Sequence, residues 1–121
     1  MKPYRNLAEI LTDQKLAALG DAYVNFVYSL ALSNRERQPA GAKVKGSALA
    51  EALRRAGLRS FMPSRITSHM LADAAEALIV YAWLHNLVTL EESVETLLKK
   101  ETLSEGLSKL ITTIVNKIKF S

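Results

Sequence analysis

The fold is decided by residues 71–84, which read LADAAEALIVYAWL. Wound as a helix, this stretch carries apolar side chains on nearly every face, so a globular protein has to bury it. Thr67 or Ser68 is a suitable first residue for the helix, and His85 stands near its end. The sequence therefore predicts a buried central helix over about 67–85.

The rest of the chain is also predicted to be helical, because only three prolines and five glycines interrupt it and no stretch alternates with period two. A first helix is expected from Tyr4 or Asn6 to about Ser33, with a possible break at Gly20. The other expected helices cover about 46–56 (ended by Gly57), 89–100 (opened by the capping box Thr89-x-x-Glu92) and a last segment from Ser104. Residues 33–43 and 58–66 are expected to be connections. The expected fold is all-α: one domain, residues 1–121, of about five or more helices.

Composition excludes several classes of protein. The chain has no cysteine, so it forms neither disulfides nor thiolate metal sites. Its start lacks the apolar core of a signal peptide, and its longest apolar stretches, 21–32 and 70–84, are short and carry acids, so we expect no membrane span. No P-loop, dinucleotide fingerprint or nucleophile elbow is present. We expect a soluble, cytoplasmic protein.

The charge is unevenly distributed along the chain. The net charge is +4, but residues 34–65 hold eight basic side chains against two acidic ones, and residues 91–105 are mainly acidic. A basic middle segment favours a polyanionic partner such as nucleic acid. Solvated helix faces carry similar charge without any partner, so charge alone leaves both interpretations open.

Three acids stand inside apolar helical segments. Asp21 lies near the head of the apolar run 19–32, where we expect it to be buried, and Asp73 and Glu76 are three residues apart, on one helix face. A buried carboxylate needs a proton, a partner or a cation. Hard divalent ions such as Mg²⁺ bind clustered carboxylates. Ion pairs with arginines or a polar rim are the alternative, and His69 is better read as a cap or surface residue than as a metal ligand.

Three motifs together resemble the endonuclease domain of the ribonuclease III family. LGDAYVNF (19–26) resembles the second half of the family signature E-R-L-E-F-L-G-D-A-V-L, and residues 71–84 resemble its downstream helix L-A-D-x-x-E-A-L-I-G-x-x-Y-L. Between them, VKGSALAEALRRAGL (44–58) is similar to the family helix V-x-x-x-x-L-A-x-x-A-x-x-L-G-L. The matched order spans about residues 14–84. It implies a short, stand-alone catalytic domain without a double-stranded-RNA-binding domain.

The resemblance implies a metal-dependent endoribonuclease that cuts double-stranded or structured RNA and works as a homodimer. In the family, the matching acids hold Mg²⁺ or Mn²⁺, so Asp21, Asp73 and Glu76 are the expected catalytic residues and metal ligands. Phosphate contacts are expected from the basic middle segment, namely Lys43, Lys45, Arg54, Arg55, Arg59 and Arg65.

The chain departs from the family pattern at two acidic positions. Ala17 stands where the family has a glutamate, although some short relatives also carry a small residue at that position. Gln14 stands where the family has another glutamate, earlier in the signature. Glu9 and Asp13 are not expected to substitute for them. The alternative is therefore a catalytically inactive ribonuclease-III-like module that binds RNA or serves in assembly. A third hypothesis is a helical dimerisation domain that binds no RNA.

Overall fold

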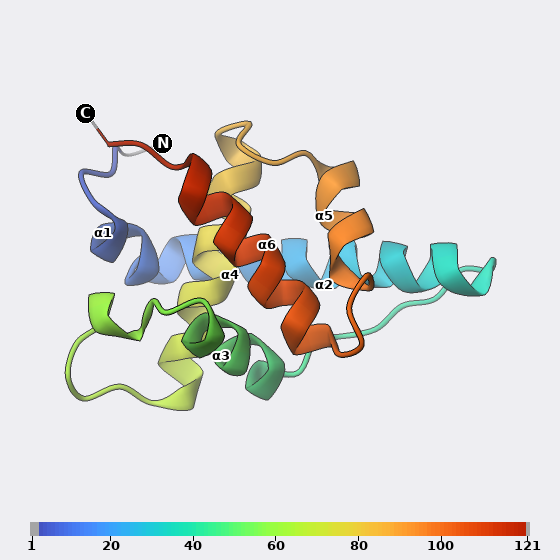
Figure 1. The fold of residues 1–121 in the computed structure, drawn as a ribbon, viewed down its shortest axis with the longest axis horizontal. Helices are drawn as coiled ribbons and strands as arrows, with labels where there is room; N and C mark the ends of the chain where they lie inside the picture. The colour runs from blue at the N-terminus through green and yellow to red at the C-terminus, as the bar shows by residue number, and fades with distance from the viewer. Residues whose placement is uncertain (1–2, 121) are drawn as a thin grey trace.

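The protein is all-α, as predicted. The computed structural model describes residues 3–120, and within them it contains six α-helices, one short 3₁₀ helix and no strand (Figure 1). The elements are α1 (Leu7–Leu11), α2 (Gln14–Glu36), α3 (Gly46–Arg55), η1 (Arg59–Phe61), α4 (Ser68–Leu84), α5 (Leu90–Leu97) and α6 (Leu103–Lys117).

Helix α4 forms the centre of the core, which confirms the prediction from residues 71–84. Thr67 caps it by accepting a hydrogen bond from the N–H of Met70, and every residue from Leu71 to Ala82 except Asp73 is buried. Helices α1, α2, α3 and α6 all pack against α4, and Figure 1 shows it crossing the long helix α2. The two helices that carry the predicted site acids are therefore in direct contact.

The first predicted helix is divided at a different place from the one expected. The break falls at residues 12–13, where Asp13 accepts hydrogen bonds from two backbone N–H groups in the first turn of α2. Such a cap satisfies donors that a helix start leaves free, so a new helix begins there. Helix α2 then runs without interruption through Gly20 and ends at Glu36, three residues beyond the predicted Ser33.

The boundaries of α3 and α4 agree closely with the predictions. Helix α3 covers Gly46–Arg55 and is followed by Gly57 with φ of +78°, a left-handed conformation that favours glycine. The segment from Gly57 to Thr67 contains the short helix η1, and the guanidinium of Arg59 donates to the carbonyls of Pro63 and Ser64 within it. These two bonds order the connection that leads into α4.

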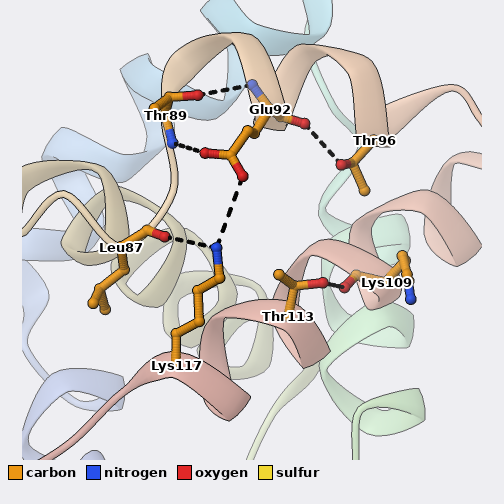
Figure 2. Close-up of polar contacts among 7 residues, drawn as sticks. All are labelled: Leu87, Thr89, Glu92, Thr96, Lys109, Thr113 and Lys117. Carbon is orange, nitrogen blue, oxygen red and sulfur yellow. Dashed lines mark hydrogen bonds and ion pairs between the residues drawn. The ribbon is translucent and has the colours of Figure 1, made fainter.

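The capping box that opens α5 is present as predicted. The Thr89 hydroxyl accepts from the Glu92 N–H, and the Glu92 carboxylate accepts from the Thr89 N–H (Figure 2). The ammonium group of Lys117 donates to the carbonyl of Leu87 at 3.2 Å and lies 3.8 Å from the Glu92 carboxylate, which ties the end of α6 to the start of α5 (Figure 2). Helix α5 stops at Leu97, earlier than expected.

The N-cap of helix α6 lies two residues before the predicted Ser104. Its N-cap is Thr102, whose hydroxyl accepts from the Glu105 N–H, and Ser104 lies inside the first turn. Gly106 makes the packing of α5 against α6 close, since a Cβ there would come within 2.0 Å of the Leu97 carbonyl oxygen. The large side chains of α6 that lie in the core are Leu107, Leu110, Ile111 and Ile114.

Helix α2 is long and apolar enough to reach across a membrane if only length and composition are considered. Buried core helices of soluble proteins pass that same test, and 44% of its most apolar window is covered by the rest of the protein. The helix packs along α4 and α5, so we interpret it as a core helix.

Candidate functional site

A hollow between α2 and α4 gathers the three acids that the sequence singled out. It has a volume of about 280 Å³, and we call it the acid pocket; its lining consists of Gln14, Ala17, Ala18, Asp21, His69, Asp73 and Glu76. Residues 14–21 come from the first half of α2, and residues 69–76 come from the first half of α4. Acids about fifty residues apart in the sequence thus surround one space.

Gly20 brings the two helices together at this point. A Cβ placed on Gly20 would lie 2.1 Å from the carbonyl oxygen of Glu76 and 2.5 Å from its carbonyl carbon. The helices therefore touch backbone to backbone, which only glycine permits. Because Asp21 follows Gly20, this contact sets Asp21 beside Glu76.

The three acids differ in burial, and one expectation was wrong. Glu76 is 7% exposed and the Asp73 side chain is 19% exposed, but Asp21 is exposed rather than buried. Helix α2 buries only part of its surface, and Asp21 lies at the open acid pocket, where its side chain remains exposed. The apolar run around Asp21 misled the prediction because two of its large side chains, Leu19 and Phe26, are themselves exposed.

The Glu76 carboxyl group has a strongly shifted pKa. Burial is the main cause, followed by a side-chain hydrogen bond with Asp21 and the negative charges of Asp21 and Asp73. Together they raise the pKa of Glu76 to about 8, while the positive charge of Lys43 acts in the opposite direction. A carboxyl group with this pKa keeps a proton at neutral pH unless a cation replaces it. The acid pocket is therefore short of positive charge.

None of the three acids forms an ion pair with an arginine or a lysine among residues 3–120. Asp73 lies 3.4 Å from the imidazole of the exposed His69, and Asp21 accepts a hydrogen bond of 3.2 Å from the side-chain amide of Asn25. The ion pairs found in this part of the chain otherwise involve other acids. Arginine pairing, the alternative suggested by the sequence, thus does not explain these acids.

The donor chemistry of the acid pocket suits a hard divalent cation, but its side chains are not gathered around one point. Carboxylate oxygens are the ligands that Mg²⁺ and Mn²⁺ prefer. Within the described residues, no three His, Asp or Glu side chains stand in an arrangement that holds a metal ion. The two helices bring the three carboxylates to one hollow, but the side chains would have to rotate before they could bind the same ion.

The two positions that depart from the family signature also line the acid pocket. Ala17 is buried and contributes only a methyl group, and Gln14 contributes an amide. Asp13 serves elsewhere, since its carboxylate caps α2 and accepts from the Tyr4 hydroxyl at 2.6 Å. Glu9 accepts from the Arg5 backbone N–H.

The six predicted RNA-contacting residues differ in their surroundings. The charge of Lys43 acts on Glu76, in the acid pocket. Arg59 is partly buried and engaged with the connection before α4, and Arg55 pairs with Glu51 at 3.1 Å. The exposed members of the set are Lys43, Lys45, Arg54, Arg55 and Arg65.

Sequence reasoning missed Asn25, which donates a hydrogen bond to Asp21. Asn25 lies one helical turn after Asp21 and also accepts a hydrogen bond of 2.7 Å from the backbone N–H of Val44. The available signal was a set of polar residues at intervals of four in an otherwise apolar helix.

The chain matches a known protein family. The sequence model of the family described as Ribonuclease III matches residues 14–120, a range that includes the acid pocket and the exposed basic residues. A comparison with curated proteins finds no match.

Proposed function

The chain belongs to the ribonuclease III family, and we propose that it is a divalent-metal-dependent endoribonuclease that hydrolyses phosphodiester bonds in double-stranded or structured RNA. One observation carries the proposal: Asp21, Asp73 and Glu76 meet in one hollow, and among residues 3–120 none of them pairs with an arginine or a lysine. Members of this nuclease family generally use divalent metals, and a hollow lined by carboxylates is suited to bind one.

We assign the three acids as ligands of Mg²⁺ or Mn²⁺. When bound, such an ion lowers the pKa of water and neutralises the charge that develops on the phosphate. Glu76 would give up its proton on binding a cation, because the positive charge would offset the burial and the neighbouring carboxylates that raise its pKa. Asp21 is exposed at the pocket, so RNA would be able to reach it.

Substrate binding is assigned to the exposed basic residues. Lys43 lies close enough for its charge to act on Glu76, so a phosphate held by Lys43 would lie near the acid pocket. Duplex RNA is bound mainly through its backbone and shape, and such binding weakens as salt increases. We expect low affinity that depends strongly on salt.

We further propose a homodimer that uses the exposed apolar side chains of α2 and α4. Leu19 is 48% exposed and Phe26 is 52% exposed, and their spacing of seven places them on one face of α2. Trp83, 41% exposed, stacks on Tyr23 with ring centroids 4.9 Å apart. Exposed aromatic surface of this kind is typical of interfaces. Light scattering at micromolar concentration should show a dimer that Phe26→Lys dissociates, and a 13 kDa species alone would contradict this.

The second candidate is a catalytically inactive module of the same fold that binds RNA or serves in assembly. Ala17 favours it, because the acid pocket has three carboxylates where the family pattern supplies more, and they are not arranged around one point. This candidate predicts duplex binding that is equal in Mg²⁺ and EDTA and is unchanged by Asp21→Asn.

A cleavage assay separates these candidates. Wild-type protein is incubated with labelled duplex RNA in Mg²⁺, Mn²⁺ or EDTA, beside Glu76→Gln and Asp21→Asn. Glu101→Gln, which alters an exposed acid between α5 and α6, is the matched control. We expect metal-dependent cleavage that both site variants abolish and the control retains. Intact RNA at stoichiometric protein in both metals contradicts the enzyme, and no retention of RNA on filters at low salt points to a dimerisation domain.

A further inference from the structure

One polar line runs along α2 away from the acid pocket. It consists of Asp21, Asn25, Ser29 and Ser33, spaced by four residues and therefore on one helix face. Three of these side chains bind the loop between α2 and α3, which covers residues 37–45.

The loop is held at alternate residues. The hydroxyl of Ser33 accepts from the N–H of Ala40 at 2.9 Å, and the hydroxyl of Ser29 accepts from the N–H of Ala42 at 3.0 Å and donates to its carbonyl. The amide oxygen of Asn25 accepts from the N–H of Val44.

This spacing has a simple geometric reason. Four residues of α-helix advance about 6 Å, and two residues of extended chain advance about 6.6 Å. An extended segment lying along α2 can therefore place every second N–H on the next polar side chain of the line. The described part of the chain contains no strand that could pair with the loop, and these side chains supply the acceptors that a strand would.

Asn25 is the point at which this line meets the acid pocket. The Val44 N–H requires an acceptor, so the side-chain oxygen of Asn25 must face it, and the amide nitrogen is thereby turned to Asp21. The same amide thus holds a site acid on one side and the loop backbone on the other. Lys43, whose charge acts on Glu76, stands between the two anchored residues Ala42 and Val44.

We propose that Asn25 is a positioning residue of the acid pocket: it fixes the Asp21 carboxylate relative to the backbone of Val44, so that the acid and the lysine-bearing loop keep one relative position. The meaning of this role for catalysis rests on the proposed function. The positioning itself concerns only contacts within the chain.

The first experiment needs neither RNA nor metal. Amide hydrogen exchange of Val44 is measured in EDTA for wild type, Asn25→Leu, Asp21→Ala and the double variant. We expect Asn25→Leu to speed exchange about tenfold, which corresponds to one lost hydrogen bond. Asp21→Ala should speed it by a smaller factor, because Asn25 loses its second partner, and should add nothing in the Asn25→Leu background. Unchanged Val44 exchange in Asp21→Ala overturns the proposal.

The second experiment measures Mn²⁺ affinity by electron paramagnetic resonance without RNA. Residues that orient metal ligands typically change affinity about 10-fold to 100-fold when removed, so we expect Asn25→Leu to weaken Mn²⁺ binding about tenfold. Ser29→Ala is the matched control: it also frees the loop, at Ala42, but leaves Asp21 held. Its Mn²⁺ affinity should stay within about twofold of wild type.

The outcomes separate the two claims. Equal Mn²⁺ affinities for Asn25→Leu and wild type, with both proteins folded by thermal melting, overturn the positioning role. Equal loss in Asn25→Leu and Ser29→Ala does so too, because the loop alone then explains it. If wild type neither binds Mn²⁺ nor cuts RNA, the proposed function fails, and the exchange measurements still decide whether Asn25 couples Asp21 to Val44.

Discussion

Replacing Gly20 with alanine tests the contact that creates the acid pocket. The new Cβ would stand 2.1 Å from the Glu76 carbonyl oxygen, and ordinary contact begins at about 3.4 Å, so the helices must separate by more than 1 Å. The neighbouring atom belongs to a helix backbone and cannot rotate away. Overpacking of a core costs about 1–3 kcal/mol, and alanine recovers about 1 kcal/mol through its helix propensity.

We expect the overpacking cost to lie at the upper end of that range, because α2 crosses the central helix and the whole α2–α4 interface has to shift. The net loss of about 2 kcal/mol corresponds to a decrease in melting temperature of roughly 8 °C for a domain of this size. The measurement is a thermal melt followed by circular dichroism. Mn²⁺ affinity should fall as well, because Asp21 and Glu76 move apart.

Gly46→Ala is the matched control, since the nearest atom to its new Cβ is 3.9 Å away and α3 gains helix propensity. Its melting temperature should equal or exceed that of wild type. A Gly20→Ala protein that melts within about 2 °C of wild type would refute the reasoning, because it would mean that the backbone contact is not tight.

Three further predictions concern the pH dependence, the capping box and the salt dependence. The pKa of Glu76 is raised from 4.5 to about 8, so its contribution to the stability of the fold is complete below pH 4.5 and is lost as the pH rises through 8. In EDTA, the melting temperature of wild type should therefore fall more steeply from pH 5 to 9 than that of Glu76→Gln. Parallel curves would contradict this. Thr89→Ala should lower the free energy of unfolding in urea by about 1 kcal/mol, because it removes the N-cap of α5. Thr96→Ala should be nearly neutral, because the Thr96 hydroxyl only donates to a helix carbonyl. Equal losses of stability in the two variants would be evidence against the capping box. Lys45→Gln should reduce the slope of log affinity against log salt concentration for duplex RNA by about 1, the value for one lost phosphate contact. Lys109→Gln, at an exposed position on α6, should leave the slope unchanged. Identical slopes for wild type and Lys45→Gln in filter binding would show that Lys45 does not contact the RNA.

The elements predicted best are those specified by local sequence. The central helix followed from an apolar stretch that only burial explains, and α5 followed from the reciprocal hydrogen bonds of its capping box. The acid pair on α4 also follows from local spacing, because residues three apart share a helix face.

The features that were missed depend on contacts between distant segments. The apolar run around Asp21 gave no information on which side of α2 faces the core, and so its exposure was predicted wrongly. The break at residues 12–13 depended on a competition between the Asp13 cap and a continuous apolar pattern, which the cap wins. The anchoring by Asn25 arises only when an extended loop lies along a helix, and neither segment shows this alone.

The central claim is that three acids in one pocket make this protein a metal-dependent nuclease for duplex RNA. Single-turnover cleavage of a labelled duplex in Mg²⁺ and Mn²⁺, compared between wild type and Glu76→Gln, tests it most directly. We predict cleavage by wild type that EDTA stops, and a loss of at least 100-fold in Glu76→Gln with its fold intact, the order expected when a site loses its chemistry. Cleavage that survives EDTA or Glu76→Gln, or no cleavage by wild type in either metal, would contradict the claim.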